Sequence, residues 1–82
     1  MIYIEVGHEP KSIDLAGKTL SLEDAQKMVG GWVEVVCLTD GKIMLVNEEG
    51  VLKKLPFNPL ATLFAGQAIL GNAIICEDCE FV

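Results

Sequence analysis

The fold is decided by residues 32–55, which read WVEVVCLTDGKIMLVNEEGVLKKL. The first part of this stretch is rich in valine, and the Asp40-Gly41 pair that follows is typical of a tight hairpin turn. The chain then returns through a second apolar strand over residues 42–46. After a further turn, residues 51–55 predict a third short strand. We therefore expect an antiparallel meander, and we expect it to form the centre of the sheet.

The residues before this meander predict a hairpin and a short helix. Apolar and polar residues alternate over residues 2–6 and again over residues 11–15, which is the period of two half-buried strands that can pair. Ser21 is a good N-cap for the helix that follows. The apolar residues after it recur on one helical face, and Gly30 is suited to the left-handed position that ends a helix.

The residues after the meander predict a second helix. Asn58 can cap its first turn, and Pro59 suits the first helical position, where the missing N–H costs nothing. The helix then covers residues 60–65. It is followed by an extended apolar stretch over residues 67–76, with a bend at Gly71.

These elements predict an α+β fold, with a mainly antiparallel sheet of about five or six strands and two short helices. The chain has 82 residues, which make a single domain over residues 1–82. We expect residues 76–82 to form an exposed acidic tail, with docking of Phe81 and Val82 as the alternative.

The composition is unusually apolar for so short a chain. Hydrophobic residues make up 51% of it, and the mean hydropathy is +0.43. A domain of this size buries only about 60% of the surface that its unfolded chain exposes. Apolar surface should therefore remain outside, and we expect a homo-oligomer. No apolar run is long enough to span a membrane, and the first residues lack a basic segment and a cleavage site, so we expect a cytoplasmic protein that does not bind membranes.

The charge balance argues against nucleic-acid binding. Twelve acidic residues face six lysines, there is no arginine, and the net charge is −6. Nucleic-acid binding depends on lysine and arginine that neutralise phosphates. A DNA mimic would suit an acidic chain, but the acids are scattered from Glu5 to Glu80 rather than gathered in runs. We interpret them as solvated surface charge.

The residues that could carry chemistry do not form a recognisable catalytic or metal site. Cys37 and His8 could form a nucleophilic pair, but a cysteine in an apolar strand is more often a small buried side chain, and we expect this of Cys37. Cys76 and Cys79 form a single C-x-x-C pair, which is half of a structural zinc site. Two chains related by symmetry could supply four cysteines, and this alternative stays open. We predict no enzyme, no metal and no cofactor.

The candidate binding residues lie in turns and loops near the meander. Aromatic side chains in loops offer a flat surface for a ring or for a partner, although core packing is the more common role of such residues and is expected ahead of binding for both of them. The neighbouring polar residues could orient a ligand, and lysines could meet a phosphate. The predicted set is Trp32, Asn47, Glu48, Lys53, Lys54, Phe57 and Asn58.

Several short elements occur in a recognisable order along most of the chain, namely GWVEVV (31–36), DG (40–41), VNEEG (46–50), LPFNPLAT (55–62) and ILGNA (69–73). Together they resemble a family of small domains of unknown function found in phages, plasmids and bacteria. The resemblance covers roughly residues 30–75, and it extends weakly to the strand and helix before them. It implies an accessory protein of mobile elements, with antagonism of host defence among its roles, and it carries over no catalytic residues.

Two functions remain open at this point. The first is a non-enzymatic protein that sequesters a small, nucleotide-like ligand at a subunit interface. The second is a protein–protein inhibitor or adaptor that acts through an exposed apolar or acidic face. The absence of arginine weighs against the first function, because it leaves only lysines and backbone N–H groups to bind a phosphate.

Overall fold

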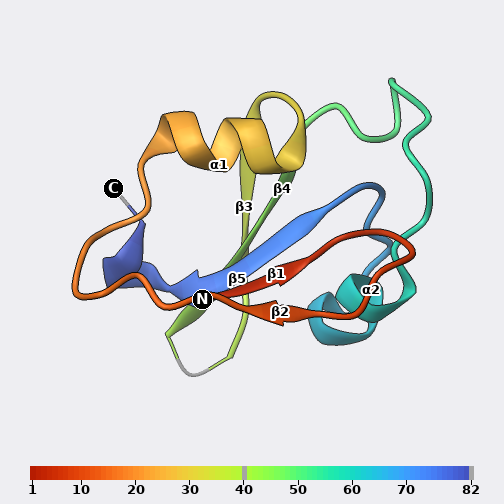
Figure 1. Cartoon of the computed structure of the whole chain (residues 1–82). Coiled ribbons are helices and arrows are strands. Elements are labelled where there is room, and N and C mark those ends of the chain that lie inside the picture. Colours follow the sequence, from red (N-terminus) through yellow and green to blue (C-terminus); the bar gives the residue numbers. More distant parts are fainter. Residues whose placement is uncertain (40, 82) are drawn as a thin grey trace.

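The computed structural model describes residues 1–39 and 41–81, and Figure 1 shows their arrangement. A five-stranded sheet has the order β2-β1-β5-β4-β3, and every neighbouring pair is antiparallel. The elements in chain order are β1 (Ile2–Ile4), β2 (Lys11–Ser12), α1 (Leu22–Val29), β3 (Val33–Cys37), β4 (Lys42–Asn47), α2 (Pro59–Ala65), β5 (Ala73–Glu77) and a 3-10 turn (Asp78–Glu80). The α+β prediction is confirmed.

Both helices begin and end where the sequence predicts. In α1, the Ser21 side chain accepts a hydrogen bond from the Asp24 N–H at 3.1 Å, and Gly30 ends the helix with φ of 82°. In α2, Asn58 is the N-cap and Gly66 takes the left-handed position. The predicted hairpin of β1 and β2 is also present, with Ile2 opposite Ser12. Local capping chemistry therefore determines the bounds of these elements.

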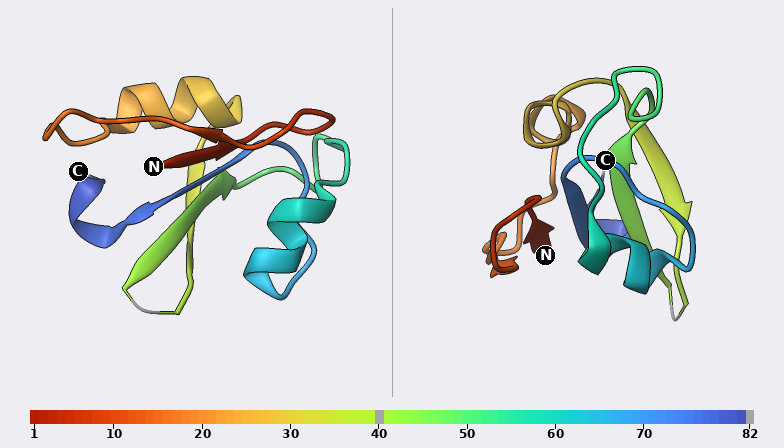
Figure 2. Two further views of the ribbon diagram at one scale, coloured as in Figure 1. Left: turned by 60° about the horizontal axis from the view of Figure 1, so that its bottom comes forward. Right: turned by 90° about the vertical axis from the view of Figure 1, so that its right-hand side faces the viewer.

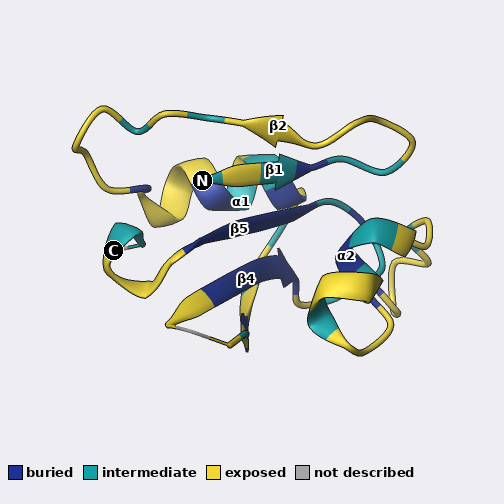
Figure 3. Ribbon diagram, turned by 90° about the horizontal axis from the view of Figure 1, so that it is seen from below, coloured by how far each residue is buried: buried dark blue, intermediate teal, exposed yellow. Residues whose placement is uncertain are grey.

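The centre of the sheet differs from the prediction. The central strand is β5, which comes from the end of the chain, and β3 of the expected meander lies at an edge. Figure 3 shows β5 buried along most of its length. It contains Ala73, Ile74, Ile75 and Cys76 in a row, so both of its faces are apolar. A strand with two apolar faces gains most from the position that is covered on both sides.

The prediction of a third strand in the meander, over residues 51–55, is wrong. Residues 51–54 form turns, and the chain bends back so that the Leu55 N–H donates to the Gly50 carbonyl at 2.9 Å. Lys54 has a positive φ of 53°, which is incompatible with a strand. Residues 51–54 are all exposed, so burial of one face does not stabilise an extended conformation here.

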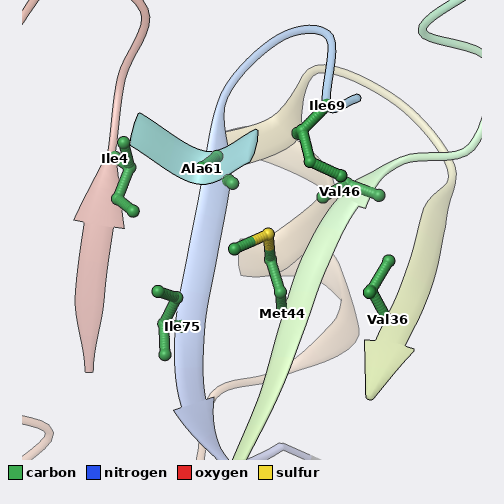
Figure 4. Packing of buried hydrophobic residues seen from close by; sticks show 8 residues of the cluster. Ile4, Val36, Met44, Val46, Ala61, Ile69 and Ile75 are labelled. Carbon is green, nitrogen blue, oxygen red and sulfur yellow. The ribbon is translucent and has the colours of Figure 1, made fainter. Parts of the chain in front are cut away.

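The sheet separates two apolar cores, one on each face. Along β4, Ile43 and Leu45 point toward α1, whereas Met44 and Val46 point toward α2. Figure 4 shows the second core, in which Ala61 of α2 packs above strands β1, β5 and β4. Figure 2 shows that α1 and α2 lie at different sides of the sheet. Only one face of each helix is therefore held by the chain itself.

The C-terminal residues are partly docked. Cys76 is buried in β5, and Phe81 pairs with Leu20 and packs against the core beside α1. The Leu20 N–H donates to the Glu80 carbonyl at 2.6 Å. The predicted docking of Val82 and the predicted turn residue Asp40 lie outside the described residues.

Candidate functional site

Several loops meet at one end of the sheet, beside α2. The ends of β1 and β4, the start of β5 and the end of α1 all lie there, so the loops that follow or precede them gather in one place (Figure 1). Two glycines permit their close packing. A Cβ on Gly50 would lie 3.0 Å from the Leu70 carbonyl oxygen, and one on Gly71 would lie 2.8 Å from Cδ1 of Leu55. This loop cluster contains all seven predicted binding residues.

Asn58 holds the loop cluster to the sheet. Its Nδ2 donates to the carbonyl oxygens of Ile4 at 3.1 Å and of Gly71 at 2.9 Å, and its Oδ1 accepts from the Ala61 N–H at 3.1 Å. The residue is only 1% exposed. Both of its N–H donors thus bind backbone, and the side chain has no donor left for a ligand.

Asn47 has a similar structural role at the end of β4. Its Nδ2 donates to the Val29 carbonyl at 3.1 Å, and its Oδ1 accepts from the Glu49 N–H at 2.8 Å. The first bond ties α1 to the sheet, and the second shapes the following turn. Asn47 is buried, so its position in the loop cluster is explained by the fold.

A third set of linked polar side chains, those of Tyr3 and Asn72, was not predicted from the sequence. The Tyr3 hydroxyl donates to the Met28 carbonyl at 2.8 Å and accepts from Nδ2 of Asn72 at 3.2 Å. Oδ1 of Asn72 in turn accepts from the Val6 N–H at 3.0 Å. Burial, and then the negative charge of Glu5, raise the pKa of Tyr3. The group fastens the end of α1 to β1 and β5, across 25 to 69 residues of sequence.

The remaining predicted residues are on the surface. Trp32 is 63% exposed and Phe57 is 52% exposed, so the expectation of core packing is wrong for both. Glu48, Lys53 and Lys54 are also exposed. Trp32 lies beside Glu48, because its carbonyl oxygen accepts from the Glu48 N–H at 2.8 Å. Lys53 pairs with Glu49 at 3.8 Å, so a neighbouring carboxylate competes with any phosphate for this lysine.

The most distinctive surface of this end is apolar. Nine large apolar side chains are exposed among the described residues, and five of them belong to α2 or to the loop before it. Figure 3 shows that most of α2 is not buried. We call the exposed apolar surface of α2 and of Phe57 just before it the end patch; it consists of Phe57, Leu63 and Phe64. The loop over residues 51–54, which contains the other two exposed residues, lies apart from it on the α1 side of the sheet (Figure 1).

The sequence of α2 contains a pattern from which the end patch could have been predicted. Residues 59–65 read PLATLFA, so α2 is apolar on every face apart from Thr62. Thr62 accepts from the Ile69 N–H at 2.9 Å, and Ala61 faces the core. A helix that is apolar all round is normally buried. The chain buries only one side of α2, which leaves Leu63 77% exposed.

A hollow of about 440 Å³ lies between α2 and the turn after β1. Its walls are mainly apolar and include Ile4, Leu60 and Leu63, with Glu5 and His8 as the groups that can carry charge. No lysine lines it. Its size and its apolar walls suit a small organic molecule better than a phosphate.

The model of a family described as a domain of unknown function, DUF3846, matches residues 1–81. The chain belongs to this family. The match confirms the resemblance to a family of unknown function, and it covers β1 and α1 as well as residues 30–75. No curated protein and no solved structure matches the chain.

The cysteines of this DUF3846 domain are arranged differently from the prediction. Cys37 is exposed, so its predicted burial is wrong, whereas Cys76 is buried. The reason is that β3 is an edge strand, and α1 covers the neighbouring strands rather than the far end of β3. His8 follows β1, and strands β5 and β4 separate β1 from β3, which contains Cys37. The two side chains therefore do not meet. Burial, and then the charge of Glu80, raise the pKa of Cys76 to about 11.

Two further features of the DUF3846 domain concern metals and membranes. Within residues 1–39 and 41–81, no three His, Cys, Asp or Glu side chains lie close enough together to hold a metal ion. No helix in the same residues has the length and apolar character needed to cross a membrane.

Proposed function

We propose that this DUF3846 domain is a non-enzymatic binding protein that docks onto another protein through the end patch. The observation that supports this most strongly is α2, an apolar helix of which the chain itself covers only one side. Water is a poor environment for Leu63 and Phe64. A protein partner that covers them gains about 1.5–3 kcal/mol for each large apolar side chain that it buries.

The polar groups of the loop cluster favour this function over recognition of a nucleotide. Asn47, Asn58, Tyr3 and Asn72 bind the backbone or one another, so they serve to hold the loops in shape. Rigid loops that present apolar side chains are typical of the centre of a protein interface, where a few large residues carry most of the affinity. Preorganisation also lowers the entropy lost on binding.

The setting that the resemblance implies fits such a role. A small accessory protein of a phage or plasmid, present in the host cytoplasm, would act by occupying a host protein, and a component of host defence is the target we propose. The net charge of −6 would speed its approach to a basic surface next to an apolar site.

A second candidate is the binding of a small molecule in the hollow beside α2. Its volume of about 440 Å³ and its apolar walls support this alternative. The two candidates differ in what they need from Leu63. A partner protein needs the whole end patch, whereas a ligand in the hollow needs Leu60 and Leu63 but not Phe57 or Phe64.

The test compares substitutions inside and outside the end patch. The Phe57→Ser, Phe64→Ser double variant should lose a host protein that the wild type retains in pull-downs from bacterial lysate. Leu22→Ser is the matched control, because Leu22 is an exposed apolar residue of α1. It should retain the same protein. Equal retention by the double variant would overturn the proposal.

A thermal-shift screen of small molecules tests the second candidate with the same proteins. A ligand of the hollow should stabilise the wild type and the double variant equally. At about 100 times its Kd, such a ligand adds about 2.7 kcal/mol to the free energy of unfolding. Stabilisation that is lost in the Leu60→Ala variant would favour the small-molecule function.

A further inference from the structure

The two edges of the sheet differ in how they are protected against pairing with another strand. The edge strand β2 has only two residues, and it begins with Lys11 directly after Pro10. Short length, lysine and proline are the usual protection of an edge. The opposite edge strand, β3, has five residues, Val33–Cys37, and contains neither lysine nor proline. Only the β2 edge carries this protection.

Within residues 1–39 and 41–81, the backbone of β3 presents a regular row of groups that no other segment pairs with. Just before β3, the Trp32 carbonyl oxygen accepts from the N–H of Glu48, which directly follows β4. Just after β3, the Leu38 N–H donates to the Lys42 carbonyl oxygen of β4 at 2.9 Å. In an antiparallel pair, alternate residues point their N–H and C=O groups at the neighbour. The residues between these, Val33, Val35 and Cys37, therefore point their backbone groups away from β4 and along the free edge.

The side chains along this edge are also apolar and uncovered. Val35 is 47% exposed, and Cys37 is exposed. Both lie on the α1 face, because they pair with Leu45 and Ile43, whose side chains belong to the core beneath α1. The free edge thus combines unpaired backbone groups with an apolar strip, which is the pattern expected of a strand that pairs with another.

We propose that β3 pairs with β3 of a second copy of this chain, in antiparallel orientation about a two-fold axis at Val35. In this register Val35 lies opposite Val35 of the second copy, and Val33 lies opposite Cys37 of the second copy. Each of these facing pairs exchanges two backbone hydrogen bonds, because both partners point their groups outward. The two sheets join into one continuous sheet.

The sequence of β3 favours a second copy as the occupant, because the strand is complementary to itself. The register centred on Val35 pairs all five residues, and it places Glu34 opposite Val36 of the second copy. A shift of two residues toward the N-terminus would place Glu34 opposite Glu34 of the second copy, which is destabilising. A shift in the other direction loses pairs. Such pairing is isologous, as in the two-fold symmetric dimers that are the commonest oligomers.

The proposed dimer has a spectroscopic signature. One position before β3, Trp32 comes opposite Leu38 of the second copy, and Trp32 is the only tryptophan of the chain. Its emission should shift to shorter wavelength when the dimer forms. The ladder is short, and it buries less area than a standard interface of about 1,600 Å². We therefore expect a dimer that dissociates on dilution.

Sedimentation equilibrium over a range of concentrations tests the dimer. The wild type should change from 8.9 kDa toward twice this mass as concentration rises. Val35→Lys should remain monomeric with an unchanged circular dichroism spectrum, because an edge lysine blocks strand pairing. Leu22→Lys is the matched control, since Leu22 is also 47% exposed but lies on α1, and it should dimerise as the wild type does. A wild type that stays at 8.9 kDa, or a Val35→Lys variant that dimerises normally, would overturn the proposal.

A cross-link tests the register independently. In a background with Cys37→Ser and Cys79→Ser, the Val35→Cys variant should form a covalent dimer on mild oxidation, because facing residues have Cα atoms about 5.5 Å apart. Leu22→Cys in the same background should not. A covalent dimer from both variants, or from neither, would contradict pairing through Val35. These outcomes are separate from those for the end patch, because none of the substitutions there touches β3.

Discussion

The side-chain amide of Asn58 donates a hydrogen bond to the carbonyl oxygen of Ile4 at 3.1 Å, across 54 residues of sequence. Asn58 begins α2, and Ile4 ends β1, so this bond joins the apolar helix to the first strand of the sheet. The position of α2, and with it the exposure of Leu63 and Phe64, depends on a polar residue that is almost fully buried.

Substitution of Asn58 by alanine should destabilise the protein by about 3 kcal/mol. It removes a helix cap, worth about 0.5–2 kcal/mol, and it leaves buried carbonyl groups of Ile4 and Gly71 without a donor. Urea unfolding followed by circular dichroism measures the change. Ser21→Ala is the control, because Ser21 caps α1 at an exposed position and its loss should cost only about 1 kcal/mol. Equal losses for both variants would show that the buried contacts of Asn58 contribute nothing.

The Tyr3→Phe variant should lose about 1–2 kcal/mol of stability. The substitution removes the hydroxyl that donates to the Met28 carbonyl and accepts from Asn72. Because these bonds hold the end of α1, amide hydrogen exchange should accelerate in α1 more than in α2. A uniform acceleration in both helices would contradict the local role of Tyr3.

The stability of the protein should decrease as pH rises from about 9 to about 11, because of Cys76. Burial raises the pKa of this thiol from 9.0 to about 11, so the folded state keeps the proton that the unfolded state loses. The contribution is fully present below pH 9 and is lost as pH passes through the folded-state value. Its upper limit is about 2.7 kcal/mol, since one pKa unit corresponds to about 1.36 kcal/mol.

Urea titrations at pH 8 and pH 10.5 measure this loss, and the Cys76→Ala variant is the control without the thiol. The variant should be less stable at pH 8, because Cys76 is buried, but its stability should fall less between the two values. A parallel decrease in wild type and variant would assign the effect to other groups, such as Tyr3, whose pKa is also raised.

Two apolar residues of similar size should respond in opposite ways to truncation. Met44→Ala should cost about 2–5 kcal/mol, because Met44 is fully buried between β4 and α2. Leu63→Ala should change the free energy of unfolding by no more than about 0.5 kcal/mol, because the side chain is exposed. Thermal unfolding at low concentration measures both. A large loss for Leu63→Ala would mean that the isolated chain already covers the end patch.

Features that depend on neighbouring residues could be predicted from the sequence. The hairpin of β1 and β2, the bounds of α1 and α2, and the caps Ser21 and Asn58 follow from turn and capping chemistry within a few residues. Residues 51–55 were the exception. Their place after the turn at residues 47–50 predicts a strand, but within the described part of the chain no partner strand and no buried face hold them extended.

The order of the strands and the character of the site were decided by the tertiary structure. Strand β5 takes the centre because its two apolar faces can be covered there by α1 and α2, and this moves β3 to an edge. The same arrangement exposes Cys37 and buries Cys76, although both lie in apolar strands. The sequence by itself determined the two helices and four of the strand segments, and it determined that the chain has more apolar residues than it can bury. Which of those residues remain outside depends on long-range packing, because burial is a property of what lies above a residue and not of the residue itself.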